Sequence, residues 1–359
     1  MRIFVTLGDL FGMLFDLGTF ECPYRTFGRT NMKTFITIAA FALTALMAHT
    51  VPLAAEIKPT TLRLAHVVNE QDAYQIAATK FQELVSERSD GAITVEIFPN
   101  ATLGDERTLL EGMQIGTVDM GIITNGPVAN FVEEMAVFEL PFLFKTPEAA
   151  YGVLDGEIGQ ELLDRLSEVN LKGLAYAERG FRNLTNSRHP VRTPADLDGL
   201  RVRVMENPVY IDTFRALGAD ATPMAWTEAL TAMQQGTIDG QENPVGVVYS
   251  FKLNETQTNM SMTRHTYAPA VFVMGMPAWG KLSDDAQEIV LQAAKDASAY
   301  ERKMNAEAEA SQLAELKASG MNVIEDADLS TFSAALEPVY EKYGQKFGDY
   351  LPRIQEALK

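Results

Sequence analysis

The chain has 359 residues, of which 47% are hydrophobic and 22% charged, and its formal net charge is −18. This balance is typical of a soluble globular protein with one large or two medium domains, and the acidic charge argues against nucleic acid or an anionic membrane as a partner. The only cysteine, Cys22, excludes an intrachain disulfide and a thiolate metal site, and the four histidines show no metal-ligand spacing. We therefore expect no metal and no cofactor.

The N-terminal region carries the pattern of an export signal. Lys33 precedes a largely apolar run of 14 residues, and the small residues Ala54 and Ala55 come directly before Glu56. Such a run is too short to span a membrane and is typical of a secretory signal peptide, although a membrane anchor is the alternative. We interpret residues 1–55 as a signal peptide, with residues 1–31 as an artefact of the assigned start, and expect a periplasmic protein.

Strands and helices alternate through the first part of the remaining chain. Residues 61–67 alternate in polarity and predict a strand, and residues 72–87 have apolar side chains at helical spacing. An aromatic, proline-broken run at 136–144 predicts a buried connection. Further strands are predicted at 93–98, 118–124 and 171–176, and further helices at 105–115 and from Pro147 onwards. This order predicts an α/β fold around a parallel, doubly wound sheet.

The second part of the chain repeats the pattern and then becomes helical. The predicted elements are a helical turn at 193–199, a strand at 200–204, a helix at 208–217, a strand at 221–224, a helix at 227–235, an alanine-rich helix at 283–317 and two later helical stretches.

One segment of ten residues recurs at an offset of 120. Residues 110–119 and 230–239 share Leu, Met, Gln, Gly, Thr and Asp at the same positions. Each copy ends a predicted helix, turns at glycine and enters a predicted strand, although two helix ends can also look alike by chance. We interpret the repeat as the mark of two similar lobes, with a ligand cleft where their strand ends converge.

The strand at 200–204 carries Arg201 and Arg203 at period two, directly before a loop and a helix that begins at Pro208. A planar guanidinium group at the carboxyl end of a strand can bind a carboxylate through two parallel hydrogen bonds. We predict that Arg203 binds an anion; the alternative is that both arginines lie on a solvated strand face.

Several motifs occur together and in order: Leu103-Gly-Asp-Glu-Arg107, Gly116-Thr-Val-Asp119, Phe138-Glu-Leu-Pro-Phe142, Leu200-Arg-Val-Arg-Val-Met205 and Asp239-Gly-Gln-Glu-Asn-Pro244. With the signal peptide, they resemble the solute-binding subunit of TRAP transporters, the DctP-like periplasmic family, and the last motif is the most specific. The resemblance implies a non-enzymatic protein whose two hinged lobes, joined by one long helix, close over an organic acid and deliver it to a sodium-driven membrane permease. The lobes expected are 56–180 plus 268–308 (lobe I) and 181–267 plus 309–359 (lobe II).

The resemblance also implies roles for individual residues. Arg203 matches the arginine that clamps the ligand carboxylate, Arg182 a second arginine that reaches the ligand, and Asn243 an asparagine that helps to hold the carboxylate. Trp226 occupies the position of an aromatic pocket wall. Thr124 stands where sialic-acid binders carry a glutamate, which argues against sialic acid as the ligand.

Three further side chains, Glu206, His66 and Glu70, are placed to meet ligand hydroxyl groups. We therefore favour a hydroxylated or sugar acid such as a hexuronate, while C4-dicarboxylates and branched hydroxy or keto acids stay open. Two other functions stay open as well: a ligand-sensing partner of a membrane receptor, and an exported sugar-acid enzyme with His66 and Glu70 as an acid–base pair. The long helix is also compatible with a homodimer.

Overall fold

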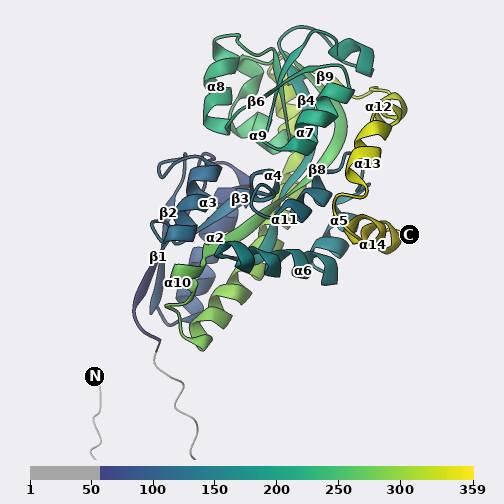
Figure 1. The fold of residues 1–359 in the computed structure, drawn as a ribbon. Helices are drawn as coiled ribbons and strands as arrows, with labels where there is room; N and C mark the ends of the chain where they lie inside the picture. The colour runs from purple at the N-terminus through teal and green to yellow at the C-terminus, as the bar shows by residue number, and fades with distance from the viewer. Residues whose placement is uncertain (1–56) are drawn as a thin grey trace, which may run out of the picture. The chain divides into compact units, whose positions relative to one another are not determined.

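The structure is a computed structural model that describes residues 57–359, so the predicted signal peptide lies outside the described residues. Within this range one nine-stranded sheet has the order β2-β1-β3-β8-β4-β7-β5-β6, and β9 pairs with β8 (Figure 1). The strands are β1 (Thr60–Ala65), β2 (Ile93–Phe98), β3 (Met120–Thr124), β4 (Leu171–Asn186), β5 (Arg201–Val204), β6 (Asp220–Pro223), β7 (Gly240–Asn243), β8 (Asn259–Gly275) and β9 (Asn322–Ile324).

Helices connect the strands and close the chain. They are α2 (Ala73–Arg88), α3 (Glu106–Ile115), α4 (Asn125–Val128), α5 (Pro147–Leu154), α6 (Glu157–Arg165), α7 (Pro208–Ala216), α8 (Trp226–Gln234), α9 (Val245–Ser250), α10 (Met276–Trp279), α11 (Asp284–Ala318), α12 (Leu329–Ala335), α13 (Glu337–Tyr343) and α14 (Tyr350–Ala357). Short 3-10 helices are η1 (Glu133–Glu139), η2 (Leu166–Val169), η3 (Pro194–Leu197) and η4 (Leu253–Glu255). No helix among residues 57–359 combines the length and the apolar character that a membrane span needs.

The sheet has two parallel parts separated by two long strands. We call β2, β1 and β3 the first half-sheet, and β7, β5 and β6 the second half-sheet; pairing is parallel within each. Between them, β4 and β8 pair antiparallel with each other and with the neighbouring half-sheets. The predicted parallel sheet is therefore correct for each half-sheet and wrong for the middle, because the chain crosses between the half-sheets twice, in opposite directions.

The middle strands were the hardest to predict because they bury charged side chains. β4 continues to Asn186, beyond the predicted end at 176, and all of it except Lys172 is buried. Arg179 donates a hydrogen bond of 2.6 Å to Asp72, and Glu178 accepts one of 2.5 Å from Tyr151. Buried charges persist when they have such partners, and none of these partners is a neighbour in sequence.

The long helix α11 packs on both parts of the molecule, with contacts to α2, β4 and α9 (Figure 1). The predicted lobe boundaries at 180/181 and 267/268 fall inside β4 and β8, and the boundary at 308/309 falls inside α11. The two expected lobes are thus joined through continuous elements, and their exact division stays a prediction.

The ten-residue repeat has the same local structure in both half-sheets. Asp119 accepts hydrogen bonds from the backbone nitrogen (2.9 Å) and Nε (3.0 Å) of Arg63, and Asp239 accepts the same pair of bonds, at 3.0 and 2.9 Å, from Arg201. Both copies turn through a glycine in the left-handed region before the aspartate. Each aspartate therefore ties its turn to the neighbouring parallel strand.

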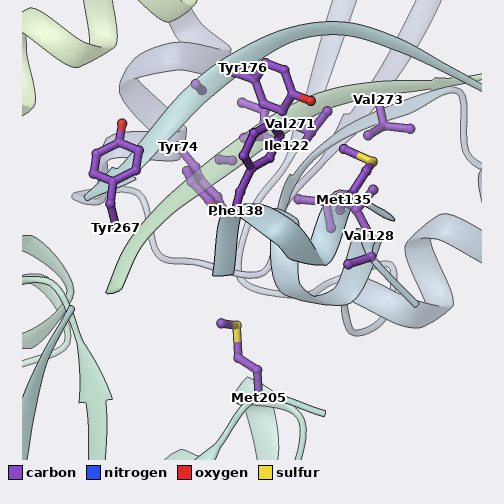
Figure 2. Close-up of a cluster of buried hydrophobic side chains, with 14 of the residues drawn as sticks. Tyr74, Ile122, Val128, Met135, Phe138, Tyr176, Met205, Tyr267, Val271 and Val273 are labelled. Carbon is purple, nitrogen blue, oxygen red and sulfur yellow. The ribbon is translucent and has the colours of Figure 1, made fainter. Parts of the chain in front are cut away.

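The core beneath the first half-sheet is apolar and aromatic (Figure 2). Phe138 packs edge to face on Tyr176, with 5.7 Å between ring centres, and the run at 136–144 is buried as predicted except for the half-buried Phe142. Figure 2 draws Met205 apart from the other labelled side chains, at the end of a strand of the second half-sheet. A Cβ added to Gly126 would lie 3.1 Å from Cε of Met205, so α4 and the end of β5 are in close contact.

Candidate functional site

A cavity of about 300 Å³ lies among loops that follow strands of both half-sheets. Its volume equals that of about ten water molecules at ~30 Å³ each, which suits a small organic molecule. The lining residues are Val67, Asp105, Glu106, Arg107, Glu111, Pro127, Asn130, Phe131, Arg203, Met205, Glu206, Met224, Ala225, Trp226 and Thr227. Of the eight predicted site residues, Arg203, Trp226 and Glu206 are brought together here.

Arg203 enters the cavity from the end of β5 and is only 3% exposed. Its Nε and one terminal nitrogen donate to the carbonyl oxygen of Met224, at 3.0 and 2.7 Å, which orients the guanidinium plane. In the described part of the chain no carboxylate lies within ion-pair distance of Arg203, whereas the other buried arginines, Arg179, Arg182 and Arg302, each have one.

The electrostatics of Arg203 follow from this lack of a partner. Burial lowers the pKa of its guanidinium to about 10, and the more distant carboxylates of Glu242, Glu106 and Glu206 offset this only in part. The group stays protonated at neutral pH. A guanidinium has five N–H donors, of which the carbonyl of Met224 engages two, so Arg203 keeps donors for an anion that enters the cavity.

Trp226 begins α8 and lies beside Arg203 in the lining. The guanidinium carbon is 5.7 Å from the ring centre, and the ring itself packs edge to face on Phe251, with 5.1 Å between ring centres. The indole is 7% exposed and fixed by these two contacts. It can therefore serve as a rigid wall for a bound molecule.

Arg182 does not line the cavity. It is 1% exposed, and it binds both carboxylate oxygens and the carbonyl oxygen of Glu242. Burial alone would lower its pKa, but the Glu242 carboxylate outweighs burial and the pKa is raised. In this structure Arg182 joins β4 to β7, and a contact between it and a ligand stays a prediction.

The remaining predicted residues lie outside the lining. Asn243, at the end of β7, donates from Nδ2 to Oε1 of Gln241 at 2.6 Å, and it is buried. His66 is buried against Gln75, with Nε2 3.0 Å from Oε1, and burial lowers its pKa. Glu70 is exposed in the loop before α2. The roles of these three residues as ligand contacts stay predictions.

Thr124 also lies outside the lining, but it contacts a residue that the sequence analysis missed. Its backbone nitrogen donates to Oε1 of Glu106 at 2.8 Å, and its hydroxyl is 2.9 Å from that of Tyr74. Glu106 stands in the first turn of α3, directly after the N-cap Asp105, and lines the cavity. The end of β3 at Thr124 thus lies against a carboxylate from α3.

Asn130 and Phe131 were missed as well, because nothing local distinguishes them in the sequence. Asn130 donates to the carbonyl oxygen of Glu206 at 2.7 Å and so links the loop after α4 to the loop after β5. For Glu106 a signal did exist: the Gly104-Asp105 helix start follows a strand of the first half-sheet, where ligands of α/β proteins bind.

Among residues 57–359 there is no cluster of three or more side chains suited to a metal ion.

Two α/β half-sheets joined by crossing strands and a long helix, with a cavity among their loops, define a periplasmic solute-binding protein. The family model for bacterial extracellular solute-binding proteins, family 7 (DctP), matches residues 64–346. The chain belongs to this family, the periplasmic, non-enzymatic solute-binding proteins of TRAP transporters.

Individual members of the family are similar to this chain over most of their length. A solute-binding protein of Verminephrobacter eiseniae is 41% identical over 290 residues, which are 80% of this chain and 86% of that protein. The 2,3-diketo-L-gulonate-binding periplasmic protein YiaO of Escherichia coli is 38% identical over 276 residues, 77% of this chain and 84% of that one. A TRAP periplasmic solute-binding protein from Polaromonas, solved with D-erythronate, has a TM-score of 0.81 and 39% identity, covering 82% of this chain and 98% of that one.

Proposed function

We propose that this protein captures a hydroxylated organic acid in the periplasm, holds its carboxylate on Arg203, and delivers it to a TRAP membrane permease. The observation that carries the proposal is the buried guanidinium of Arg203, which lines the cavity without a carboxylate partner among the described residues. A buried cation without a counter-ion is costly, so a bound carboxylate stabilises it strongly.

The ligands of relatives support an acid of this size. Structures of similar proteins contain D-erythronate, galactonate, D-glucuronate or galacturonate, at 39%, 34%, 31% and 34% identity to this chain. Relatives named for C4-dicarboxylates are also present, at 32% and 30% identity. The family membership supports the permease as the partner, and the two lobes would close over the acid with β4, β8 and α11 as the connection.

A thermal-shift screen of the purified protein against an organic-acid library tests the proposal. A ligand at 100 times its Kd stabilises the folded state by about 2.7 kcal/mol, which raises the melting temperature by roughly 5 °C in a protein of this size. Arg203→Ala should bind any hit about 30- to 3,000-fold more weakly, because truncating one member of a buried charge pair costs about 2–5 kcal/mol. A screen without an acid hit, or an unchanged affinity in Arg203→Ala, would contradict the proposal.

A further inference from the structure

The cavity is lined by more negative than positive charge, although its expected ligand is an anion. Its carboxylates belong to Asp105, Glu106, Glu111 and Glu206, and its guanidinium groups to Arg107 and Arg203. The Arg107 side chain is 73% exposed, and its Nε binds Glu111 at 2.9 Å, so water and this partner offset its charge. Arg203 is therefore the buried cation of the lining, and the cavity has one strong position for a carboxylate.

Glu106 presents a fixed carboxylate to this cavity. The backbone nitrogen of Thr124 donates to its Oε1 at 2.8 Å, and the residue stands in the first turn of α3. Within residues 57–359 no side chain or backbone donor engages Oε2 of Glu106, so this oxygen can accept a hydrogen bond from a ligand.

Glu206 brings a second carboxylate from the other half-sheet. It follows β5 two residues after Val204, and its carbonyl oxygen is tied to Asn130 at 2.7 Å, which fixes the loop at the cavity. Glu106 and Glu206 line the same cavity as Arg203, and among the described residues neither carboxylate lies within ion-pair distance of its guanidinium. The two half-sheets thus each contribute one acidic acceptor.

From this arrangement we infer that Glu106 and Glu206 restrict the cavity to acids that carry one carboxylate and several hydroxyl groups, and that they reject acids with a carboxylate at both ends. An ionised carboxylate only accepts hydrogen bonds, so hydroxyl donors of a ligand satisfy it. A second ligand carboxylate has no proton to donate and meets like charge, and such repulsion is a means of specificity. The inference rests on the proposed function and narrows it.

Matched acids that differ only at the far end provide the test. Erythronate and meso-tartrate form one pair and galactonate and galactarate another, because each diacid replaces the terminal CH₂OH of its partner by a carboxylate. Titration calorimetry at pH 7.5 should give a Kd about 100-fold higher for the diacid in any pair whose monoacid binds. A diacid that binds as tightly as its monoacid would overturn the inference.

Three variants test whether Glu106 and Glu206 cause the discrimination between monoacids and diacids. Glu106→Gln and Glu206→Gln remove one charge each with little change in shape, and each should narrow the ratio of the two Kd values about tenfold. Glu288→Gln, on the exposed surface of α11, removes the same charge away from the cavity and should leave the ratio unchanged. Equal ratios in all three variants would refute the role of Glu106 and Glu206.

The outcome also separates this inference from the function on which it rests. If monoacid and diacid bind equally and Arg203→Ala weakens both, the arginine site stands and the acidic restriction fails. If neither class binds the unaltered protein, the proposed function fails as well.

Discussion

The guanidinium carbon of Arg203 lies 5.7 Å from the centre of the Trp226 ring, and both side chains line the same cavity. The two residues come from different elements, the end of β5 and the start of α8, and the carbonyl of Met224 fixes the guanidinium between them. A cation over an aromatic face gains about 0.5–2 kcal/mol, with the larger value for a desolvated pair. The Trp226 ring thus partly offsets the desolvation of the buried Arg203 guanidinium. Its position leaves N–H donors of Arg203 available to a ligand.

Arg203→Lys should lose most of the acid affinity although it keeps the positive charge. An ammonium group cannot donate two parallel hydrogen bonds to a carboxylate, and it does not reproduce the planar contact with Trp226. We expect Kd to rise at least about tenfold in titration calorimetry, with a melting temperature of the unliganded protein close to that of the parent. A lysine variant with parental affinity would show that charge alone suffices.

Arg182→Met should lower the stability of the unliganded protein. The substitution leaves the buried carboxylate of Glu242 without its bidentate partner, and breaking a buried ion pair in this way costs about 3–5 kcal/mol. Urea denaturation of the unliganded protein measures this loss. Arg203→Met is the matched control, and it should lose much less stability because it strands no carboxylate among the described residues. Equal losses in the two variants would contradict this difference.

The buried carboxyl group of Glu139 should make the free energy of unfolding depend on pH. Burial raises the pKa of Glu139 to about 7, although hydrogen bonds from Tyr210 (2.6 Å) and Asn125 (2.7 Å) oppose the shift. The folded state keeps this proton up to about pH 7, whereas an unfolded glutamate loses it above about pH 4.3, so stability falls as the pH rises between these values.

Glu139→Gln should therefore flatten the stability profile between pH 5 and pH 8. We expect the free energy of unfolding of the parent to decline across this window by on the order of 2–3 kcal/mol more than that of the variant. Urea titrations at unit pH steps provide the comparison. Burial also raises the pKa of Glu178 to about 7, so a shallower decline should persist in the variant. Parallel profiles of the two proteins would contradict the assignment to Glu139.

The repeated turns predict matched effects of Asp119→Asn and Asp239→Asn. Each aspartate accepts hydrogen bonds from the backbone and the guanidinium of an arginine on the neighbouring strand, so each amide variant should lose about 1–3 kcal/mol. Thermal unfolding of both variants measures the losses. A large loss in one variant and none in the other would show that the two turns are not energetically equivalent.

The sequence predicted the periodic elements well and the middle of the sheet poorly. Local signals sufficed for α3 and α7, where a polar N-cap precedes each helix, and for the turns of the repeat. Polar residues interrupt β8, and no strand was predicted there. His265, for example, is buried with its Nε2 3.3 Å from Oε2 of Glu242 on β7. Partners that are distant in the chain cannot be read from a local pattern.

The same contrast between local signals and distant contacts applies to the residues of the candidate site. Arg203 was predicted from its place at a strand end and Trp226 from the family resemblance, and both line the cavity, while their contacts with a ligand stay predictions. For Glu106 the helix start after a strand was a signal, but its contact with the backbone of Thr124, 18 residues away in the chain, could not be read from the sequence. The contact between Arg182 and Glu242 is likewise a tertiary contact, although Glu242 lies within a motif that carried the family resemblance.

The central position of β4 and β8 has a consequence for dissection of the molecule. Since every strand pairing that connects the half-sheets among the described residues passes through these two strands, we expect neither half to fold as an autonomous fragment. A fragment that ended at β3, or one that began at β5, would expose an unpaired strand edge, which is a template for aggregation. Fragment complementation or domain transplantation should therefore cut the chain in the surface loops around α12 to α14 and leave both middle strands whole.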